Sequence, residues 1–472
     1  MQTETNHSKL RRYYGIIKSA VRGDEYDFTT INLRKAVVLL AIPMMLELSL
    51  ESVFAVVDIF FVNKIGVHAV SVVGLTESVI TIVYSIAIGI SAAATALVAR
   101  RIGEKNPEGA SHAGGQAIVL GVVASLALGV PGFLFAGDIL RLMGAQPEAI
   151  EKGINYARIM LGGNVVIVML FLINGIFRGA GNASIAMKSL WIGNIFNIVL
   201  DPLFIFGIGF FPKCGVTGAA IATTIGRSAG VIYQIYQLRK SSGILNIQAR
   251  HYKPNLQILK SLTKIASPAA FQFIIASASW IFLAAMVAEY GSEASAGYQT
   301  AIRLIVFFIL PAWGMSNAVA TLVGQNLGAN RADRAEQSVR ITSKYNSVFM
   351  ALVTCVFLFF SPALLGVFIP AEQTEQLHYA ILALQIISSG YIFYGIGMVV
   401  TQAFNGAGDT RTPTWIYFFG FWIFQVPFAY LLHKYSSLGI IGIFIAVPVA
   451  ETLMAVSVYV LFRRGKWKTV KV

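Results

Sequence analysis

Twelve long apolar stretches recur along the sequence, and they restrict the possible folds more than any other feature. Each is about 20 residues or longer, which is the length that a helix needs to cross a bilayer. Hydrophobic residues make up 56% of the chain and charged residues only 12%, too few to cover the surface of a soluble protein of this size. We therefore expect an all-α integral membrane protein with twelve transmembrane helices. The expected spans are 33–62, 67–99, 112–136, 155–176, 185–210, 216–240, 261–289, 294–325, 339–368, 379–404, 412–434 and 438–463.

The basic residues indicate which ends of these spans face the cytoplasm. Of the 36 Lys and Arg residues, 28 fall in the tails and in the loops that follow even-numbered spans, and only 5 fall in the other loops. Because cytoplasmic loops carry the excess of Lys and Arg, both termini are expected in the cytoplasm. The net charge of +14 then belongs mostly to cytoplasmic loops, and we do not expect a nucleic-acid partner.

The second half of the chain repeats the first at an offset of about 225 residues. The run from Gly66 to Ala110 aligns without a gap with the run from Gly291 to Ala335. Further matches are FRGAGN from Phe177 with FNGAGD from Phe404, and GVTGAAIAT from Gly215 with GIIGIFIAV from Gly439. A repeat with six spans has an even number of helices, so the two halves run parallel, as in transporters that hold substrate between their halves.

This repeat predicts two pseudo-symmetric six-helix bundles. We expect an N-lobe at 33–240 and a C-lobe at 261–463, joined by a basic cytoplasmic linker at 241–260. Residues 1–32 and 464–472 are expected to be cytoplasmic tails. A cleavable signal peptide is not expected, because the first apolar run begins late and is long.

Polar residues occur inside spans of the N-lobe where the C-lobe carries mostly apolar ones. The set is Asp58, Asn174, Asn197, Asp201 and Thr223, opposite Leu283, Thr401, Trp422, Val426 and Val447. Carboxylates are costly within a bilayer and commonly mark ion or proton pathways. Carboxylate, amide and hydroxyl oxygens are hard ligands, suited to H⁺ or Na⁺ and not to zinc. We therefore expect cation coupling in the N-lobe and no other cofactor.

Four more residues extend this candidate site. Glu47 and Glu51 lie on one side of a helix with Asp58, and Asn194 lies on one face with Asn197 and Asp201. Glu47, Glu51 and Asn194 are therefore candidate cavity residues. Pro43 is a candidate hinge, because proline frees backbone groups and permits a kink. Simpler interpretations remain open: interhelical hydrogen bonds for the amides and Thr223, a buried structural pair for the two aspartates, and a static kink at Pro43.

Enzyme motifs give little support to a catalytic function. RGAGN and NGAGD lack the strand-to-helix setting and the Lys-Ser/Thr pair of a phosphate-binding loop. HExxH, paired CxxC and GxSxG motifs do not occur in the sequence. We therefore do not expect an enzyme.

In the combined order and spacing of its motifs, the sequence resembles the multidrug and toxic compound extrusion (MATE) family from about residue 33 to 463. The resemblance is carried by Pro43, VVDIFFVNKIG at 56–66, FRGAGN at 177–182, NIVLDPLFIFG at 197–207 and GVTGAAIAT at 215–223. It looks closer to the DinF-like branch than to the NorM-like branch, whose acids in spans 7 and 10 are here Gln272 and Tyr394. The resemblance implies a cation pocket at Asp58, Asn174, Asn197, Asp201 and Thr223, with Asp58, Asn197, Asp201 and Thr223 as candidate Na⁺ ligands.

The function implied by the resemblance is secondary antiport: export of amphipathic, often cationic compounds in exchange for H⁺ or Na⁺. We expect a monomer in a prokaryotic cytoplasmic membrane, with lipid and small amphipathic molecules as its partners. The alternative is a flippase of lipid or lipid-linked oligosaccharide in the same superfamily, which the scarcity of basic residues within the spans disfavours. A channel or receptor is disfavoured by the two-lobe repeat.

Overall fold

The described part of the chain is built from helices and contains no strand. The computed structural model describes residues 6–65, 67–240 and 244–472, without the side chains of 6–13, 55, 56, 58–60, 62, 63, 67 and 68. The first half holds α1 (Asn6–Arg22), α2 (Leu33–Asn63), α3 (Val67–Gly103), α4 (Pro107–Leu134), α5 (Ala136–Leu142), α6 (Pro147–Gly162), α7 (Asn164–Gly179), α8 (Ala183–Phe206) and α9 (Val216–Arg239). The second half holds η1 (Ala249–Tyr252), α10 (Leu256–Ala288), α11 (Ser292–Gly328), α12 (Ala332–Gly366), α13 (Thr374–Ser388), α14 (Tyr391–Ala407), α15 (Arg411–Tyr417), η2 (Phe418–Gln425), α16 (Val426–Tyr435), α17 (Ile440–Arg463) and η3 (Lys466–Thr469).

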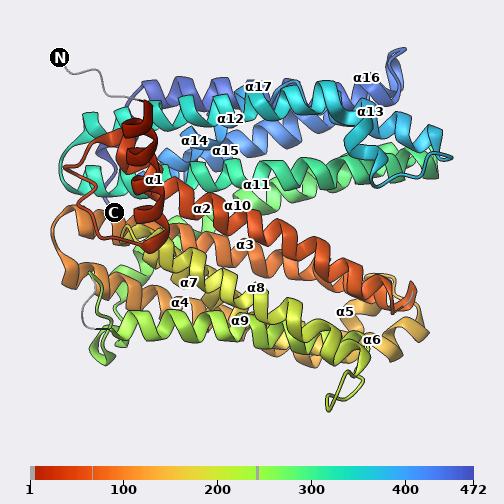
Figure 1. Ribbon diagram of the computed structural model, residues 1–472, viewed down its shortest axis with the longest axis horizontal. Coiled ribbons are helices and arrows are strands. Elements are labelled where there is room, and N and C mark those ends of the chain that lie inside the picture. The colour runs from red at the N-terminus through yellow and green to blue at the C-terminus, as the bar shows by residue number, and fades with distance from the viewer. Residues whose placement is uncertain (1–5, 66, 241–243) are drawn as a thin grey trace.

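These helices form two bundles, with α2–α9 in one and α10–α17 in the other (Figure 1). The bundles lie close together at the end of the molecule that carries α1 and the C-terminus, which we call the α1 end, and they diverge toward the opposite end (Figure 1). Helices α2 and α3 of the first bundle pack against α11 and α10 of the second. Each bundle has its own buried apolar cluster.

The predicted spans correspond closely to the helices. Ten segments of the described chain are long and apolar enough to cross a membrane, and α13 with α14 forms an eleventh that is bent by 54°. Helix α9 occupies the one remaining predicted span, the sixth in chain order, at 216–240. It is less apolar than most of the others because it carries Thr223, Arg227 and Gln234, all of which are buried inside the first bundle.

Matching breaks occur in the two bundles. Helix α6 ends at Gly162 and α7 begins at Asn164, while α13 ends at Ser388 and α14 begins at Tyr391. The residues at these breaks, Gly163 and Gly390, are repeat-related at an offset of 227. Both are N-cap residues with closely similar backbone angles, a φ of −83° and of −89°. The internal repeat therefore extends to the local irregularities of the fold.

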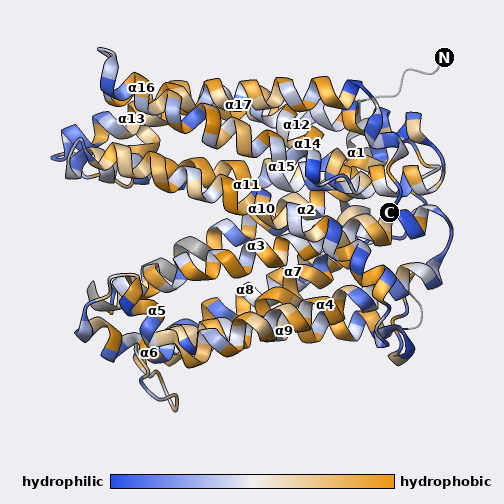
Figure 2. Ribbon diagram, turned by 180° about the vertical axis from the view of Figure 1, so that it is seen from behind, coloured by the Kyte–Doolittle hydropathy of each residue, from blue (hydrophilic) through white to orange (hydrophobic). Residues whose placement is uncertain are grey.

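The outer faces of the helices are apolar, as contact with lipid requires. On α4, Val123, Leu126 and Val130 are each more than half exposed, and these three lie on one side of the helix. Hydrophilic residues gather at the two ends of the molecule, and apolar residues dominate the length between them (Figure 2). The chain is a multi-pass membrane protein.

At the α1 end the two bundles meet through repeat-related contacts. A Cβ atom on Gly103 of α3 would overlap the carbonyl oxygen of Gln325, and one on Gly328 of α11 would overlap the carbonyl oxygen of Arg100. Gly103 and Gly328 are repeat mates, as are Arg100 and Gln325, both at an offset of 225. The side chains repeat the pattern: Gln325 donates to the carbonyl of Gly179 at 3.0 Å, and Arg100 to that of Ala407 at 3.4 Å. We call these contacts the glycine interlock.

The segment between α1 and α2 connects to both bundles at the same end. Lys105, in the loop after α3, bonds the Asp27 carboxylate at 2.7 Å. Arg331, just before α12 of the second bundle, donates to the carbonyl of Thr29 at 2.8 Å. Partial burial opposes ionisation of Asp27, but the hydrogen bonds from Lys105 and Thr29 outweigh it and lower its pKa to about 2.

Candidate functional site

Helix α2 presents two glutamates to the interior of the first bundle, and polar side chains of α7, α8 and α9 meet them. The α8 residues Ser189, Asn194, Asn197 and Asp201 follow one another from the α1 end outward and are all buried. They contact three groups of side chains along the bundle. We call these groups the inner, middle and outer clusters, in order of distance from the α1 end along α8.

The inner cluster surrounds Glu47, which is 2% exposed. Asn174 on α7 donates to Glu47 Oε1 at 3.1 Å, and a guanidinium nitrogen of Arg178 lies 3.5 Å from the same oxygen. The Asn174 amide oxygen accepts hydrogen bonds from Ser189 at 2.8 Å and from Gln234 at 2.6 Å. Glu47 Oε2 has no hydrogen-bond partner among the described residues. The inner cluster is thus a buried ion pair held in place by three polar side chains.

The middle cluster lies one helical turn further along α2. Asn194 donates to Glu51 Oε2 at 3.1 Å, and Arg227 on α9 lies 3.7 Å from Glu51 Oε1. The Arg227 guanidinium also lies 5.5 Å from the centre of the Tyr84 ring, within the range of a cation–π contact. Glu51 and Arg227 therefore form a second acid–base pair inside the bundle.

The outer cluster joins three of the predicted site residues. Asn197 donates to the Thr223 hydroxyl at 2.9 Å and to Asp201 Oδ1 at 3.4 Å. Asp201 is fully buried, and Asn197 is 2% exposed. The Asn197 amide oxygen has no hydrogen-bond partner among the described residues, so it offers a lone pair to a cation. Asp58 belongs to helix α2, but its side chain lies outside the described residues.

The predicted residues therefore fall in more than one place. Asn197, Asp201 and Thr223 lie together, whereas the hydrogen bonds of Asn174 go to Glu47 and its neighbours. Glu47, Glu51 and Asn194 each face another member of the polar interior. Pro43 is buried within α2, which continues through it as one helix from Leu33 to Asn63.

Four members of these clusters were not among the predicted site residues: Arg178, Ser189, Arg227 and Gln234. Arg178 lies beyond the predicted end of its span at 176, so it counts as a loop residue in the sequence, whereas α7 continues to Gly179. Gln234 stands opposite Val458 in the repeat, at an offset of 224. The same comparison that selects Thr223 would have selected Gln234.

The clusters combine acidic and basic side chains in the interior of the bundle. Glu47 faces the guanidinium group of Arg178 and Glu51 faces that of Arg227, whereas the third described acid, Asp201, accepts a hydrogen bond from Asn197. Each ionised buried group needs a counter-charge or a bound cation to offset its desolvation. No group of three or more His, Cys, Asp or Glu side chains suited to a metal ion occurs in the part of the chain that the structure describes. The chemistry of the clusters fits a proton or a monovalent cation.

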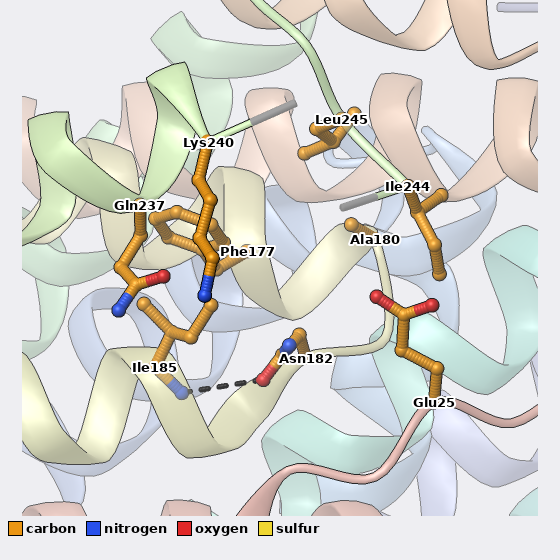
Figure 3. A pocket seen from close by; sticks show the side chains of 9 residues that line it. All are labelled: Glu25, Phe177, Ala180, Asn182, Ile185, Gln237, Lys240, Ile244 and Leu245. Atoms are coloured by element: carbon orange, nitrogen blue, oxygen red, sulfur yellow. Dashed lines mark hydrogen bonds between the residues drawn. The ribbon is translucent and has the colours of Figure 1, made fainter. Parts of the chain in front are cut away.

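A hollow opens at the α1 end of the same bundle, and Figure 3 shows its lining. It has a volume of about 160 Å³ and lies between Phe177 on α7, Ile185 on α8 and Gln237 on α9, each of which is within about one turn of an inner-cluster residue. Glu25 faces it from the segment between α1 and α2, and the Lys240 side chain reaches toward Asn182 (Figure 3). The hollow is a recess of mixed polar and apolar lining next to the inner cluster.

Two repeat-related helical bundles in a membrane, with ionisable groups buried in the interior, are the construction of a transporter. A model of the MatE family matches residues 43–203 and 268–431, once in each half of the chain. The protein belongs to the MatE family of transporters. The family predicted from the sequence is confirmed, and the two matches agree with the internal repeat.

Individual relatives support this assignment. The chain is 28% identical to the "Probable multidrug resistance protein YoeA" of Bacillus subtilis (strain 168), over 89% of this chain and 91% of the relative. It is 27% identical to a protein of Shewanella oneidensis named "FAD transporter", over 87% of this chain and 90% of the relative. A solved structure described as the outward-facing conformation of a multidrug resistance MATE family transporter of the MOP superfamily matches with a TM-score of 0.88. That match has 27% identity and covers 94% of this chain and 98% of the other. The predicted fold is confirmed.

Proposed function

We propose that this protein is a multidrug exporter of a prokaryotic cytoplasmic membrane, driven by the entry of H⁺ or Na⁺ through its first bundle. The observation that carries the proposal is the set of buried oxygen ligands in the outer cluster, close to the buried carboxylate of Asp201. We place both termini in the cytoplasm because of the distribution of Lys and Arg, and the α1 end is then the cytoplasmic end. The lobes at 33–240 and 261–463 move relative to each other about the linker at 241–260, and the protein acts as a monomer.

The exchange of a cation for substrate follows from a change in charge inside the first bundle. A cation that enters the first bundle neutralises Asp201, and Asp58 on the neighbouring helix is proposed to share this role. Neutralisation changes the affinity for substrate differently in the two orientations of the lobes. A ligand shifts a conformational equilibrium only through such a difference in affinity. Cationic, amphipathic substrates suit a bundle whose interior clusters hold three described carboxyl groups, those of Glu47, Glu51 and Asp201.

The test is transport by the purified full-length protein in proteoliposomes. Ethidium export is measured with a proton gradient and, separately, with a sodium gradient, which identifies the coupling ion. Asp201→Asn keeps the shape and removes the charge, so gradient-driven export should fall about 100-fold, at the upper end of typical coupling factors. The control is Asp333→Asn, because the Asp333 side chain is 97% exposed. Export by Asp201→Asn at the rate of the unmodified protein would show that this carboxylate does not couple transport.

An anionic, nucleotide-like substrate is the second candidate, because one relative is named a FAD transporter. Arg178 and Arg227 could attract such a substrate, but each faces a glutamate, at 3.5 Å and 3.7 Å. This pairing favours the cationic class. Export of FAD by the same proteoliposomes, with ethidium export absent, would decide for the anionic class.

A further inference from the structure

The second bundle contains a small cavity with one carboxylate in its wall. Glu451 on α17 lines it, together with Tyr391 and Tyr394 on α14 and Trp280 on α10. The remaining lining is apolar except for the backbone of Gly390, and no Lys, Arg or His lines the cavity in the described chain. A carboxylate placed among aromatic and aliphatic side chains within a membrane bundle is unfavourable unless a proton or cation accompanies it.

The internal repeat identifies the residue of the first bundle that is equivalent to Glu451. Counted from the matching glycines Gly215 and Gly439, Glu451 is the repeat mate of Arg227. In the first bundle Arg227 lies 3.7 Å from Glu51, so the two charges balance each other. In the second bundle the sign at this position is reversed, and the repeat mate of Glu51 is Ala276, which carries neither a charge nor a polar side chain. Of these two equivalent positions, only the one in the first bundle, Arg227, is paired with an opposite charge from the helix position of Glu51.

A second polar group lines the same cavity. Tyr391 is 3% exposed, and its hydroxyl has no hydrogen-bond partner among the described residues. A buried hydroxyl without a partner is unfavourable, and a bound water or ion would satisfy it. The titratable groups near Glu451 are Tyr391 and Tyr394 on α14 and Tyr417 on α15. All three are neutral phenols at physiological pH, and none of them supplies a positive charge.

The size of the cavity limits what it can hold. Its volume is about 20 Å³, which is room for about one water molecule. A drug-sized organic cation does not fit, whereas a proton on the carboxylate, with or without a water, or a single alkali cation does. Pro448 lies one helical turn before Glu451 on α17, at a position where the helix lacks one backbone donor.

We propose that Glu451 and the Tyr391 hydroxyl form a second cation site, in the C-lobe, that binds H⁺ or Na⁺ and discharges it during each transport cycle. Binding itself depends only on the geometry of the cavity, whereas the role in the cycle rests on the proposed antiport function. The site would work alongside the outer cluster of the first bundle. The two bundles would then each carry one cation-dependent element, built from different residues at non-equivalent positions.

The binding test uses pH-difference infrared spectra of the purified full-length protein. The unmodified protein should show a protonated-carboxyl band that Glu451→Gln abolishes and that Tyr391→Phe shifts, because the phenol lines the same cavity as the carboxyl group. Glu375→Gln, at an exposed position at the start of α13, is the matched control and should leave this band unchanged. Titration in NaCl and in choline chloride separates the two ions. A midpoint that moves to lower pH in NaCl identifies Na⁺ as a competitor, and an unchanged midpoint identifies H⁺ alone.

The transport test uses the same variants in proteoliposomes. Glu451→Gln should lower gradient-driven export about tenfold while ethidium binding is retained. A spectrum in which Glu451→Gln removes no band, or export equal to that of the unmodified protein, overturns the proposal. If the unmodified protein exports no probe under either gradient, the antiport function fails. The spectra then still decide whether the C-lobe site exists, so the two failures are distinguishable.

Discussion

At the scale of single residues, the state of charge of Glu47 is open to measurement. Its carboxylate faces Arg178 at 3.5 Å, and the Arg178 side chain is 13% exposed. Glu47→Gln would leave this guanidinium buried without its counter-charge, and we expect a loss of about 3 kcal/mol in stability. Thermal unfolding in detergent would show it as a lower Tm. Adding Arg178→Gln should recover part of the loss in a double-mutant cycle. If Glu47→Gln alone leaves the Tm unchanged, Glu47 is protonated and the ion pair does not exist.

The sequence predicts which residues are polar and interior, but it does not predict their partners. Helix periodicity puts Glu47 and Glu51 on one stripe, and the repeat identifies Asn174 as unusual. Which neighbouring helix faces that stripe depends on the packing of four helices, which no single helix encodes. The sequence therefore groups Asn174 with Asp201, whereas its side-chain amide donates a hydrogen bond to Glu47.

At the scale of elements, the segment between α1 and α2 is expected to be held by Asp27. The Thr29 amide donates to Asp27 Oδ1 at 3.0 Å, so Asp27→Ala should speed hydrogen exchange in residues 24–32 by about tenfold through loss of that bond. Glu25→Ala, at an exposed position in the same segment, is the control and should change nothing.

This contact should also be insensitive to pH in the physiological range. The pKa of Asp27 is lowered from 3.8 to about 2 in the folded protein, so the stabilisation is fully present above about pH 4 and is lost as the pH falls through about 2. Protection of residues 24–32, corrected for intrinsic exchange, should therefore stay constant from about pH 5 to 8. A loss of protection between about pH 5 and 7 would contradict this account of Asp27.

Most elements were predictable because apolar length is a strong signal, and the exceptions have physical causes. The span predicted at 155–176 is two helices, α6 and α7, that meet at Gly163, and its repeat mate breaks at Gly390. Hydropathy does not register such a break, because glycine interrupts a helix without changing its polarity. Helix α1 was missed because residues 1–32 carry no long apolar run.

At the scale of the whole molecule, the repeat predicts two bundles but not which end of the molecule holds them together. That choice depends on small differences in free energy between two orientations of similar packing. The structure locates the contact at the α1 end, where Gly103 and Gly328 admit the backbone of the opposite bundle. The identity of these glycines in both halves was visible in the sequence. Their role was not, because glycine is common throughout the chain at 43 residues.

The glycine interlock should therefore control the balance between the two orientations of the lobes. In Gly103→Ala and Gly328→Ala the added methyl group would overlap a carbonyl oxygen of the opposite bundle. Overpacking of this kind costs about 1–3 kcal/mol, so the population closed at the α1 end should fall by about tenfold. Gly74→Ala, with no atom within 4 Å of its Cβ position, is the matched control.

Spin labels at the exposed positions Glu151 on α6 and Glu372, just before α13, would report the change, because both lie in the part of the molecule where the bundles diverge (Figure 1). Rocking of the lobes requires the label-to-label distance to shorten when the α1 end opens. Both interlock variants should therefore show a larger short-distance population than Gly74→Ala. Since Gly103 and Gly328 are repeat mates, their effects should be similar in size. If the distance distribution stays the same in both variants, these glycines do not determine which end of the transporter is closed, and they serve only the close packing of the two bundles.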